Sequence, residues 1–407
     1  MSKLSEMIAT LCPNGVEYKK LGEVATIERG SGLQKSDFVA EGFPCIHYGQ
    51  LYTRFNTVAT SEFTYVSEKT AQGLKRLHNG DILMAVTSEN VEDVCKCIAW
   101  LGEYDVAVGG HTAIIRHSQD AKYLAYWFQT EDFFRQKKKL AHGTKVIEVT
   151  PKRLEDVVIP LPPLPIQREI VQILDNFANL TAELTAELAK RKKQYEHYRD
   201  ILFEPSTDTW ARVTVEDIAD TFVGLATSVT PYQRESGVLL IHNSDVQQNE
   251  IVLKQRVYLD DAFVRRNSKK LFQKDDIVTV HTGDVGTSAV ISDEYVGCIG
   301  FTTLTTRIRD TTKVLPRYLA HYFNSHRCKQ DIATKTISDR SNLNQSSFSR
   351  LSIPLPPLAE QKRIVAILDR FDSLCNSLTE GLPAEIALRK KQYEYYRDKL
   401  LSFKEAG

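Results

Sequence analysis

The sequence contains one long-period repeat, and this repeat constrains the fold more than any other feature. The segment IPLPPLPIQREIVQILDNF at 159–177 returns as IPLPPLAEQKRIVAILDRF at 353–371, an offset of 194 residues. The segment RKKQYEHYRD at 191–200 returns as RKKQYEYYRD at 389–398, where the offset is 198. Weaker matches at nearly the same offset run through the rest of each half. The chain is therefore a tandem duplication whose connecting segments stayed alike while the other parts diverged.

The length sets the expected number of domains. The chain has 407 residues, more than one domain usually contains, and its 42% hydrophobic and 26% charged residues are typical of a globular protein with real cores. We expect globular domains at 1–158 and 205–352, each followed by a connecting segment, at 159–204 and 353–407. The divergence between the domains suggests one scaffold with two different specificities, although simple drift would give the same contrast.

Each half reads as short strands followed by a helix. β-rich runs between turn signals lie at 80–86, 97–101 and 113–116, and at 276–281, 288–292 and 304–309. Helical spacing of apolar residues predicts one helix over 122–140 and one over 316–333. A last strand, at 157–160 and 351–354, leads into PLPPL, which cannot be helical because proline lacks the amide donor and forces its predecessor into extended geometry. The expected class is α+β, with two similar β-rich domains.

An amphipathic segment follows each PLPPL. Ile, Leu, Phe and Tyr recur at steps of three, four or seven from Ile166 to Leu202 and from Ile364 to Leu400, so each segment predicts about 37 residues and about 55 Å of helix if unbroken. A helix of this length with one apolar stripe needs a similar helix beside it. We therefore expect a long antiparallel coiled-coil pair that separates the two domains in a pseudo-twofold arrangement. A merely structural or dimerising coiled coil would show the same stripe.

The two spacer segments differ by one step of this stripe. The first contains TAELTAEL at 181–188, a four-residue unit written twice, and each unit adds about 6 Å of helix while it keeps the same face apolar. Such a spacer suits a ruler of adjustable length between two sites. The second contains Gly381-Leu382-Pro383, and interior proline costs about 3 kcal/mol, so we expect a kink or a new helix with Pro383 in its first turn. The RKKQYE runs are either a solvated face or a basic, tyrosine-flanked surface for a protein partner.

Charge and cysteine content limit the class of protein. Lys plus Arg and Asp plus Glu each total 52, so a chain that binds nucleic acid would need partner subunits to supply much of the contact with phosphates. No apolar run is long enough for a membrane span and the start lacks a signal-peptide pattern, so we expect a cytoplasmic protein. The seven cysteines are odd in number and mostly flanked by apolar residues, which indicates buried thiols, and no metal site is expected.

The motifs of several enzyme classes are missing. We find no Gly-rich cofactor turn with an Asn/Asp-Pro-Pro-aromatic loop, which a methyltransferase needs, and no GxxxxGK(S/T), which an ATP-driven translocase needs. Gly-x-Ser-x-Gly is also missing. Asp275-Asp276 could belong to a nuclease metal cluster, but its context matches the ordinary turn Asn79-Gly80-Asp81 of the other half. The sequence therefore predicts a chain without a catalytic centre.

The duplicated PLPPL helix starts, the RKKQYE helix ends and the TAELTAEL tandem together resemble the specificity subunits of type I restriction-modification systems, most closely the type IC (R124-like) family. The resemblance spans essentially the whole chain. It implies two target-recognition domains that read a bipartite, asymmetric target in double-stranded DNA. It also implies two modification subunits, which bind S-adenosylmethionine and methylate adenine, and two restriction subunits, which translocate and cleave DNA with ATP and Mg. No cofactor is expected in this chain.

The candidate DNA-binding residues lie in loops between predicted strands, at equivalent places in both halves. Arg, Lys, Asn and Gln can contact bases in two places at once, and Ser, Thr and His can bind phosphates. For any one of them, a solvated turn residue is the alternative. In the first half the candidates are His47, Tyr48, Gln50, Thr87, Ser88, Asn90, His111, Thr112, Thr144 and Lys145. In the second half they are His242, Asn243, Asp245, His281, Thr282, Asp284, Thr302, Arg340, Ser341, Asn342 and Asn344.

A second class of function also fits the sequence. A coiled-coil scaffold whose duplicated domains bind other proteins would show the same repeat and the same apolar stripe. The two hypotheses differ in one respect, because only the first predicts sequence-selective binding to DNA.

Overall fold

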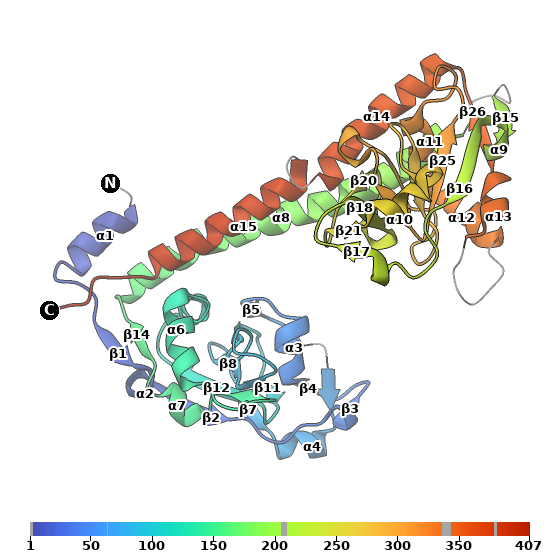
Figure 1. The fold of residues 1–407 in the computed structure, drawn as a ribbon. Coiled ribbons are helices and arrows are strands. Elements are labelled where there is room, and N and C mark those ends of the chain that lie inside the picture. Colours follow the sequence, from blue (N-terminus) through green and yellow to red (C-terminus); the bar gives the residue numbers. More distant parts are fainter. Residues whose placement is uncertain (1–2, 63, 205–209, 336–342, 378–380) are drawn as a thin grey trace. The chain divides into compact units, whose positions relative to one another are not determined.

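The computed structural model describes residues 3–62, 64–204, 210–335, 343–377 and 381–407 (Figure 1). The chain forms two compact units: unit 1 contains Met1–Glu183 and Ile386–Gly407, and unit 2 contains Leu184–Glu385. Unit 2 is thus one continuous stretch, whereas unit 1 combines the first part of the chain with its last residues. In unit 1 this combination is fixed by main-chain hydrogen bonds from Val16 N to Lys404 O (2.8 Å) and from Ala406 N to Val16 O (3.0 Å).

Unit 1 contains two five-stranded sheets, in the orders β2-β12-β8-β10-β5 and β3-β6-β4-β11-β7, and two small pairs, β1-β14 and β13-β9. Apart from the long helices, its elements are α1 (Lys3–Leu11), β1 (Tyr18–Lys20), α2 (Leu21–Val24), β2 (Ala25–Arg29), β3 (Phe38–Val39), β4 (Phe43–Ile46), α3 (Tyr48–Thr53), β5 (Val58–Ala59), β6 (Thr64–Val66), α4 (Glu68–Gln72), β7 (Lys75–Leu77), β8 (Ile82–Ala85), β9 (Thr87–Ser88), β10 (Cys97–Trp100), β11 (Val106–Val108), β12 (Thr112–His117), α5 (Ala121–Trp127), α6 (Glu131–Leu140), β13 (Ile147–Glu148), α7 (Pro151–Leu154) and β14 (Val158–Pro160).

Unit 2 repeats this plan with sheets β16-β25-β22-β23 and β17-β21-β18-β24 and the pairs β15-β26 and β19-β20. Its elements are β15 (Ala211–Thr214), α9 (Val215–Ile218), β16 (Ala219–Val223), β17 (Gln233–Arg234), β18 (Val238–His242), β19 (Val246–Gln247), β20 (Glu250–Ile251), β21 (Val257–Leu259), α10 (Asp261–Arg265), β22 (Ile277–Val280), β23 (Ser288–Val290), β24 (Ile299–Phe301), β25 (Thr303–Ile308), α11 (Pro316–Phe323), α12 (His326–Lys335), α13 (Gln345–Ser349) and β26 (Ser352–Leu355). The predicted α+β class with two similar domains is confirmed.

One prediction about the helices is wrong in both halves. The segments predicted as single helices over 122–140 and 316–333 are each two helices, α5 with α6 and α11 with α12. At each break a side-chain hydroxyl caps the start of the second helix. Thr130 Oγ1 accepts a hydrogen bond from Phe133 N (3.3 Å), and Ser325 Oγ accepts one from Cys328 N (3.2 Å). A side chain that caps the second helix competes with continuation of the first, so periodicity alone did not reveal the break.

The long helices follow the predicted pattern with one refinement. Helix α8 (Leu164–Leu202) is continuous over 39 residues. The second copy is divided into α14 (Leu358–Asn376) and α15 (Gly381–Leu400), and Pro383 lies in the first turn of α15, as predicted. The last leucine of each PLPPL is already the first residue of the helix, so only the preceding residues are the extended exit.

Each unit contains an antiparallel pair of helix segments, as the apolar stripe predicted. In unit 1, Phe177 of α8 stacks on Tyr396 of α15 with ring centroids 5.4 Å apart, and Ile166, Ile170, Leu174 and Leu401 are buried in one cluster. In unit 2, Tyr195 and Tyr198 of α8 stack on Phe371 of α14, at 6.1 and 5.7 Å. Burial of these apolar side chains on both helices is what keeps the segments together.

A carboxylate clamp, defined as Asp175 in unit 1 and Asp369 in unit 2, joins the long helix to the globular part. Asp175 of α8 accepts hydrogen bonds from Lys122 Nζ (2.7 Å) and Tyr126 OH (2.6 Å). In unit 2, Asp369 of α14 accepts them from Arg317 Nη2 (2.5 Å) and His321 Nε2 (2.7 Å). The donors are a cation and a polar ring four residues apart on α5 or α11, so both come from one face of that helix.

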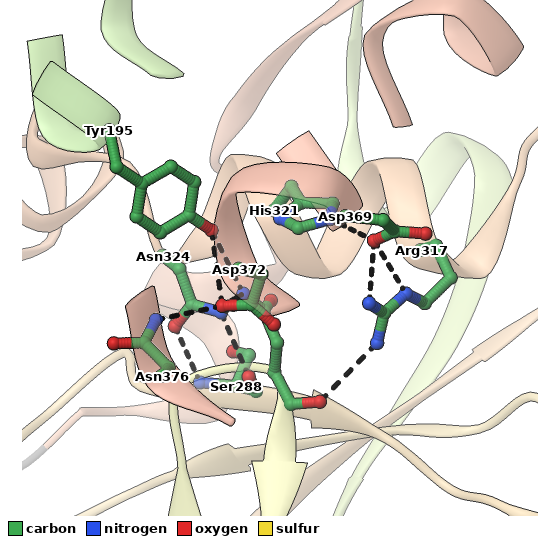
Figure 2. A network of polar contacts seen from close by, with 9 residues as sticks. Tyr195, Ser288, Arg317, His321, Asn324, Asp369, Asp372 and Asn376 are labelled. Carbon is green, nitrogen blue, oxygen red and sulfur yellow. Dashed lines mark hydrogen bonds and ion pairs between the residues drawn. The ribbon is translucent and has the colours of Figure 1, made fainter. Parts of the chain in front are cut away.

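Unit 2 extends its clamp into a larger polar network. Figure 2 shows Tyr195, Asn324 and Asp372 pointing toward one another beside the clamp. Asn249, which has φ 66°, donates through Nδ2 to Asp372 Oδ1 (3.2 Å) and accepts at Oδ1 from Asn324 Nδ2 (2.9 Å). Asn324 also bonds both main-chain groups of Ser288 on β23, at 2.9 Å each. The network therefore connects the helix pair directly to the sheet of the same unit.

His321 should make the stability of unit 2 depend on pH. Burial lowers the pKa of this fully buried imidazole below its usual 6.5, and the Arg317 charge opposes protonation, although Asp369 and Asp372 favour it. Below about pH 6.5 the imidazole is protonated in the unfolded chain but binds the proton less well in the folded unit. The free energy of unfolding should therefore fall as the pH decreases from 7.5 to 5, by at most about 2 kcal/mol. The pKa of Asp369 is lowered and adds stability only above its usual value of 3.8. The contribution of this carboxylate to stability therefore stays constant between pH 7.5 and 5.

The variant His321→Tyr isolates this contribution, because Tyr126 occupies the equivalent position in unit 1. It replaces the imidazole with a hydroxyl donor to Asp369 that does not titrate in this range. Urea unfolding of both proteins between pH 7.5 and 5 should give a flatter profile for the variant. Equal slopes would contradict the assignment to His321.

Candidate nucleic-acid interface

In unit 1, three loops meet at the ends of strands β4, β8 and β11. The rings of Tyr48, at the start of α3, and His111, in the β11–β12 turn, lie 4.9 Å apart. Thr87 Oγ1, just after β8, lies 3.1 Å from His111 Nδ1, and Tyr52 OH donates to the Thr87 carbonyl (2.9 Å). His47 caps α3 by accepting a hydrogen bond from Gly49 N (3.2 Å). The structure thus brings together candidates that lie up to 64 residues apart in the sequence.

A hollow of about 570 Å³ opens between these loops. It is lined by Tyr48, Gly49, Tyr52, Thr53, Thr87, Ser88, Glu89, Asn90, Asp93, Lys96, His111 and Val146. Strand β13 pairs with β9, which brings the loop that contains Thr144 and Lys145 to the same edge. Arg29 connects the β11–β12 turn to strand β13, because it donates to the Gly110 carbonyl (3.0 Å) and forms an ion pair with Glu148 (2.9 Å).

In unit 2, Asn243 joins the corresponding loops. Its Nδ2 donates to the Thr282 carbonyl (3.2 Å) and to Thr302 Oγ1 (3.0 Å), and its Oδ1 accepts from His281 N (3.3 Å). Leu343 N donates to the His281 carbonyl (2.9 Å), so the segment that precedes Asn344 also reaches this cluster. The ends of β18 and β22 and the β24–β25 turn therefore meet as their counterparts do in unit 1.

The candidates differ in exposure. Exposed side chains are Asn90, His111, Thr144, Lys145, Thr282, Asp284 and Asn344. Half-buried side chains are Tyr48, Gln50, Ser88, His242, Asn243, His281 and Thr302. Buried side chains are His47, Thr87, Thr112 and Asp245. The remaining candidates, Arg340, Ser341 and Asn342, lie outside the described residues.

Several buried or half-buried candidates are occupied by local hydrogen bonds. Thr112 Oγ1 donates to the Gly109 carbonyl (2.6 Å), Gln50 Oε1 accepts from His47 N (2.9 Å), and the Asp245 carboxylate accepts from His242 N (2.9 Å) and Lys254 N (3.1 Å). These groups hold the shape of their loops. In unit 1, Asn90 is exposed, but its side chain donates to Asp93 Oδ2 (2.8 Å) and accepts from Asp93 N (2.7 Å). The exposed side chains of His111, Thr144 and Lys145 are therefore the candidates that a ligand can reach.

Two histidines of the loops, His47 and His281, have a pKa below the usual value and so favour the neutral form. Burial, followed by the charges of Lys35 and His111, lowers the pKa of His47, and burial lowers the pKa of His281. A neutral imidazole offers one N–H donor and one acceptor. Such groups suit the mixed donor and acceptor pattern of base edges better than the uniform negative charge of phosphates.

Tyr52 and Lys96 line the unit 1 hollow but were not predicted. Tyr52 follows Tyr48 by one helical turn of α3, so the four-residue spacing of two tyrosines was the signal that could have identified it. Lys96 lies between Cys95, which has φ 68°, and β10, and no local sequence pattern marks it.

No group of three or more His, Cys, Asp or Glu side chains suited to a metal ion occurs in the described part of the chain. Among the helices of the described residues, none combines the length and apolar character that crossing a membrane requires. All seven cysteines are free thiols; Cys12 is half-buried and the other six are buried, as predicted.

Asn243→Ala should loosen the loop cluster of unit 2. It removes three hydrogen bonds to two segments, which should lower the free energy of unfolding by about 1–2 kcal/mol and speed amide hydrogen exchange in 281–284 and 300–303. Ser244→Ala, at the exposed neighbouring position, is the control and should change neither quantity. Unchanged exchange in the Asn243 variant would show that the loops are held by other contacts.

The chain matches the family of type I restriction modification DNA specificity domains twice, over residues 13–191 and 207–388. The Escherichia coli EcoR124I/EcoR124II type I restriction enzyme specificity subunit is 35% identical over 300 residues, which cover 69% of this chain and 70% of that protein. A putative type I restriction enzyme specificity subunit from Haemophilus influenzae is 29% identical over 408 residues, 95% of this chain and 96% of that protein.

Two solved structures have a similar fold. A chain from a structure that concerns complex assembly and conformational transition of a type I restriction-modification system has a TM-score of 0.68 at 19% identity, with 96% of this chain and 98% of that chain covered. The HsdS subunit from Thermoanaerobacter tengcongensis has a TM-score of 0.53 at 19% identity, with 96% and 97% covered. At 19% identity this likeness shows the fold alone.

Proposed function

The chain belongs to the type I restriction-modification DNA specificity family, and from this premise we propose that it reads a bipartite, asymmetric DNA target, one half-site with each unit. The observation that carries the proposal is the repetition of one loop cluster with different side chains. The same strand ends present Tyr48 and His111 in unit 1 where unit 2 has Asn243 and Thr302, while a threonine, Thr87 or Thr282, is common to both clusters. Equivalent positions with unlike donors and acceptors would select unlike base pairs.

Methyltransferase and restriction subunits are the partners that the family implies, and the charge and the helix ends of this chain fit such partners. A chain without net charge gains little from phosphate neutralisation alone, so we assign much of the contact with the DNA backbone to two methyltransferase and two restriction subunits. The exposed Tyr198 and Tyr395 in the RKKQYE helix ends offer them an aromatic surface next to basic residues. S-adenosylmethionine, ATP and Mg would then bind to these partners, and this chain would take no cofactor and catalyse no reaction.

His111 and His281 test the assignment of one half-site to each unit. His111→Ala should weaken binding to the unit 1 half-site by about 1–3 kcal/mol, roughly 5- to 150-fold, and relax its sequence preference, while the other half-site keeps its preference. His281→Ala should do the reverse. The measurement is selection from random DNA by the chain assembled with its methyltransferase subunits. A coiled-coil scaffold for proteins predicts no sequence-selective retention in any of these proteins, and that result would overturn the proposal.

A change in the length of α8 tests whether this helix sets the gap between the two half-sites. One additional TAEL unit after Leu188 adds about 6 Å of helix and turns the following residues by about 40°, so it nearly preserves the apolar face. We expect a longer gap between half-sites and the same two half-sites, measured by methylome sequencing of cells that carry the variant. A three-residue insertion, which rotates the stripe the other way by about 60°, is the control and should impair folding. Changed half-sites would count against the ruler.

A further inference from the structure

The two units differ at one position beside the carboxylate clamp. The repeat aligns Asp372 of α14 with Ala178 of α8, three residues after the clamp carboxylate in each case. In unit 2 the Asp372 carboxylate accepts hydrogen bonds from Asn376 Nδ2 (2.9 Å), Asn249 Nδ2 (3.2 Å) and Tyr195 OH (3.5 Å) (Figure 2). Unit 2 therefore places a carboxylate of its own between the helix pair and the sheet.

Unit 1 has a pocket of about 400 Å³ at the corresponding place. Ala178, Tyr393 and Gln129, which line it, are the counterparts of Asp372, Tyr195 and Asn324. The Gln129 amide donates to Thr57 Oγ1 (3.0 Å), as the Asn324 amide donates to Asn249 in unit 2. An amide and a tyrosine thus stand at equivalent places in both units, whereas the carboxylate of Asp372 has no counterpart at Ala178.

The lining of this pocket is positively charged. Lys96 and Lys390 line it, and no Asp or Glu does. Burial raises the pKa of the Cys95 thiol to about 12 and that of Cys97 well above its usual value, so neither thiol carries a compensating negative charge. Lys96 Nζ donates to the Tyr52 carbonyl (3.3 Å), a neutral acceptor, so the lining, with Lys390, carries positive charge and favours a negatively charged ligand.

The remaining lining supplies a donor and apolar walls. The Tyr393 hydroxyl, counterpart of the Tyr195 donor, makes no hydrogen bond within the described part of the chain. Phe55 and Phe128 give the pocket aromatic surface. A pocket of this kind suits a ligand that has one anionic end and an apolar body.

We propose that this unit 1 pocket binds a carboxylate group carried on a small apolar body, in the position that the Asp372 carboxylate occupies in unit 2. The carboxylate comes either from an acidic side chain that a partner protein inserts or from a free small carboxylic acid. The inference does not depend on the DNA target, because it rests on the comparison of the two halves of one chain.

Phenylacetate and its uncharged analogue phenylacetamide are suitable probes, titrated against the full chain by ligand-observed NMR. We expect phenylacetate to bind at least tenfold more tightly than the amide, and Lys96→Gln/Lys390→Gln to lose this difference. Lys138→Gln, at an exposed lysine of the same unit outside the pocket, should keep it. Equal affinity for acid and amide, or no binding of either, would overturn the proposal.

Ala178→Asp tests the same site from within, because it supplies the carboxylate that unit 2 has at this position. The substitution lies at an exposed helix position, and the folded state can be checked by thermal unfolding. It should reduce phenylacetate binding at least tenfold, whereas Asn179→Asp, which adds the same charge at the next residue, should not. If the Ala178→Asp variant is folded and binds phenylacetate as tightly as the unmodified chain, the proposed carboxylate position in the pocket is wrong.

Addition of the methyltransferase subunits distinguishes the two sources. If a partner side chain fills the pocket, assembly displaces phenylacetate, and Ala178→Asp weakens assembly at least tenfold relative to Asn179→Asp. If a free acid fills it, phenylacetate stays bound in the assembly and both variants assemble alike. DNA selectivity measured in parallel reports on the proposed function separately, since the pocket can fail this test while DNA reading survives.

Discussion

The carboxylate clamp is the interaction on which the placement of each globular part depends. Asp175 and Asp369 receive a cation and a polar ring from the helix that covers the sheet, and these contacts fix how the long helix crosses that layer. Asp175 and Asp369 are 28% and 38% exposed, so each clamp stabilises its unit more than a fully exposed ion pair and less than a buried one. The candidate loops at the strand ends lie on a sheet that is tied to the long helix of the same unit in this way.

The two interiors satisfy this constraint with different chemistry. Unit 1 buries Met84, Ile114 and Ile115 where unit 2 buries Thr279, Thr305 and Thr306. Apolar packing tolerates small shifts, whereas buried polar groups are favourable only when donor and acceptor meet, as the hydroxyls of Thr279 and Ser288 do at 2.8 Å. The left-handed backbone of Asn249 is the strained element that lets its side chain serve the helix pair and the sheet together.

Periodicity predicted most elements, because strands and long helices show their buried faces directly in the sequence. The strand runs of both halves, the continuous α8 and the new helix at Pro383 all followed from it. The break before α6 was missed because Trp127 and Phe133 continue the apolar pattern across it, although Thr130 followed by Glu131 and Asp132 has the composition of a helix start. For the described residues, the candidate loops lie at equivalent strand ends in the two units, but no sequence pattern predicted that they meet in space. Which side chains stay free depends on local hydrogen bonds such as those of Thr112 and Asp245, which no spacing reveals.

The last residues of the chain belong to the core of unit 1, and this sets an order of events during synthesis. Unit 2 is contiguous and has all its parts once residue 385 has left the ribosome. Unit 1 is complete only when Leu401 and Glu405 have been made. Leu401 is 1% exposed within the main hydrophobic cluster of this unit, and Glu405 forms a strand bridge to Val16. The half that is made first is therefore completed last, and until then its apolar helix face is available to chaperones or to a wrong partner.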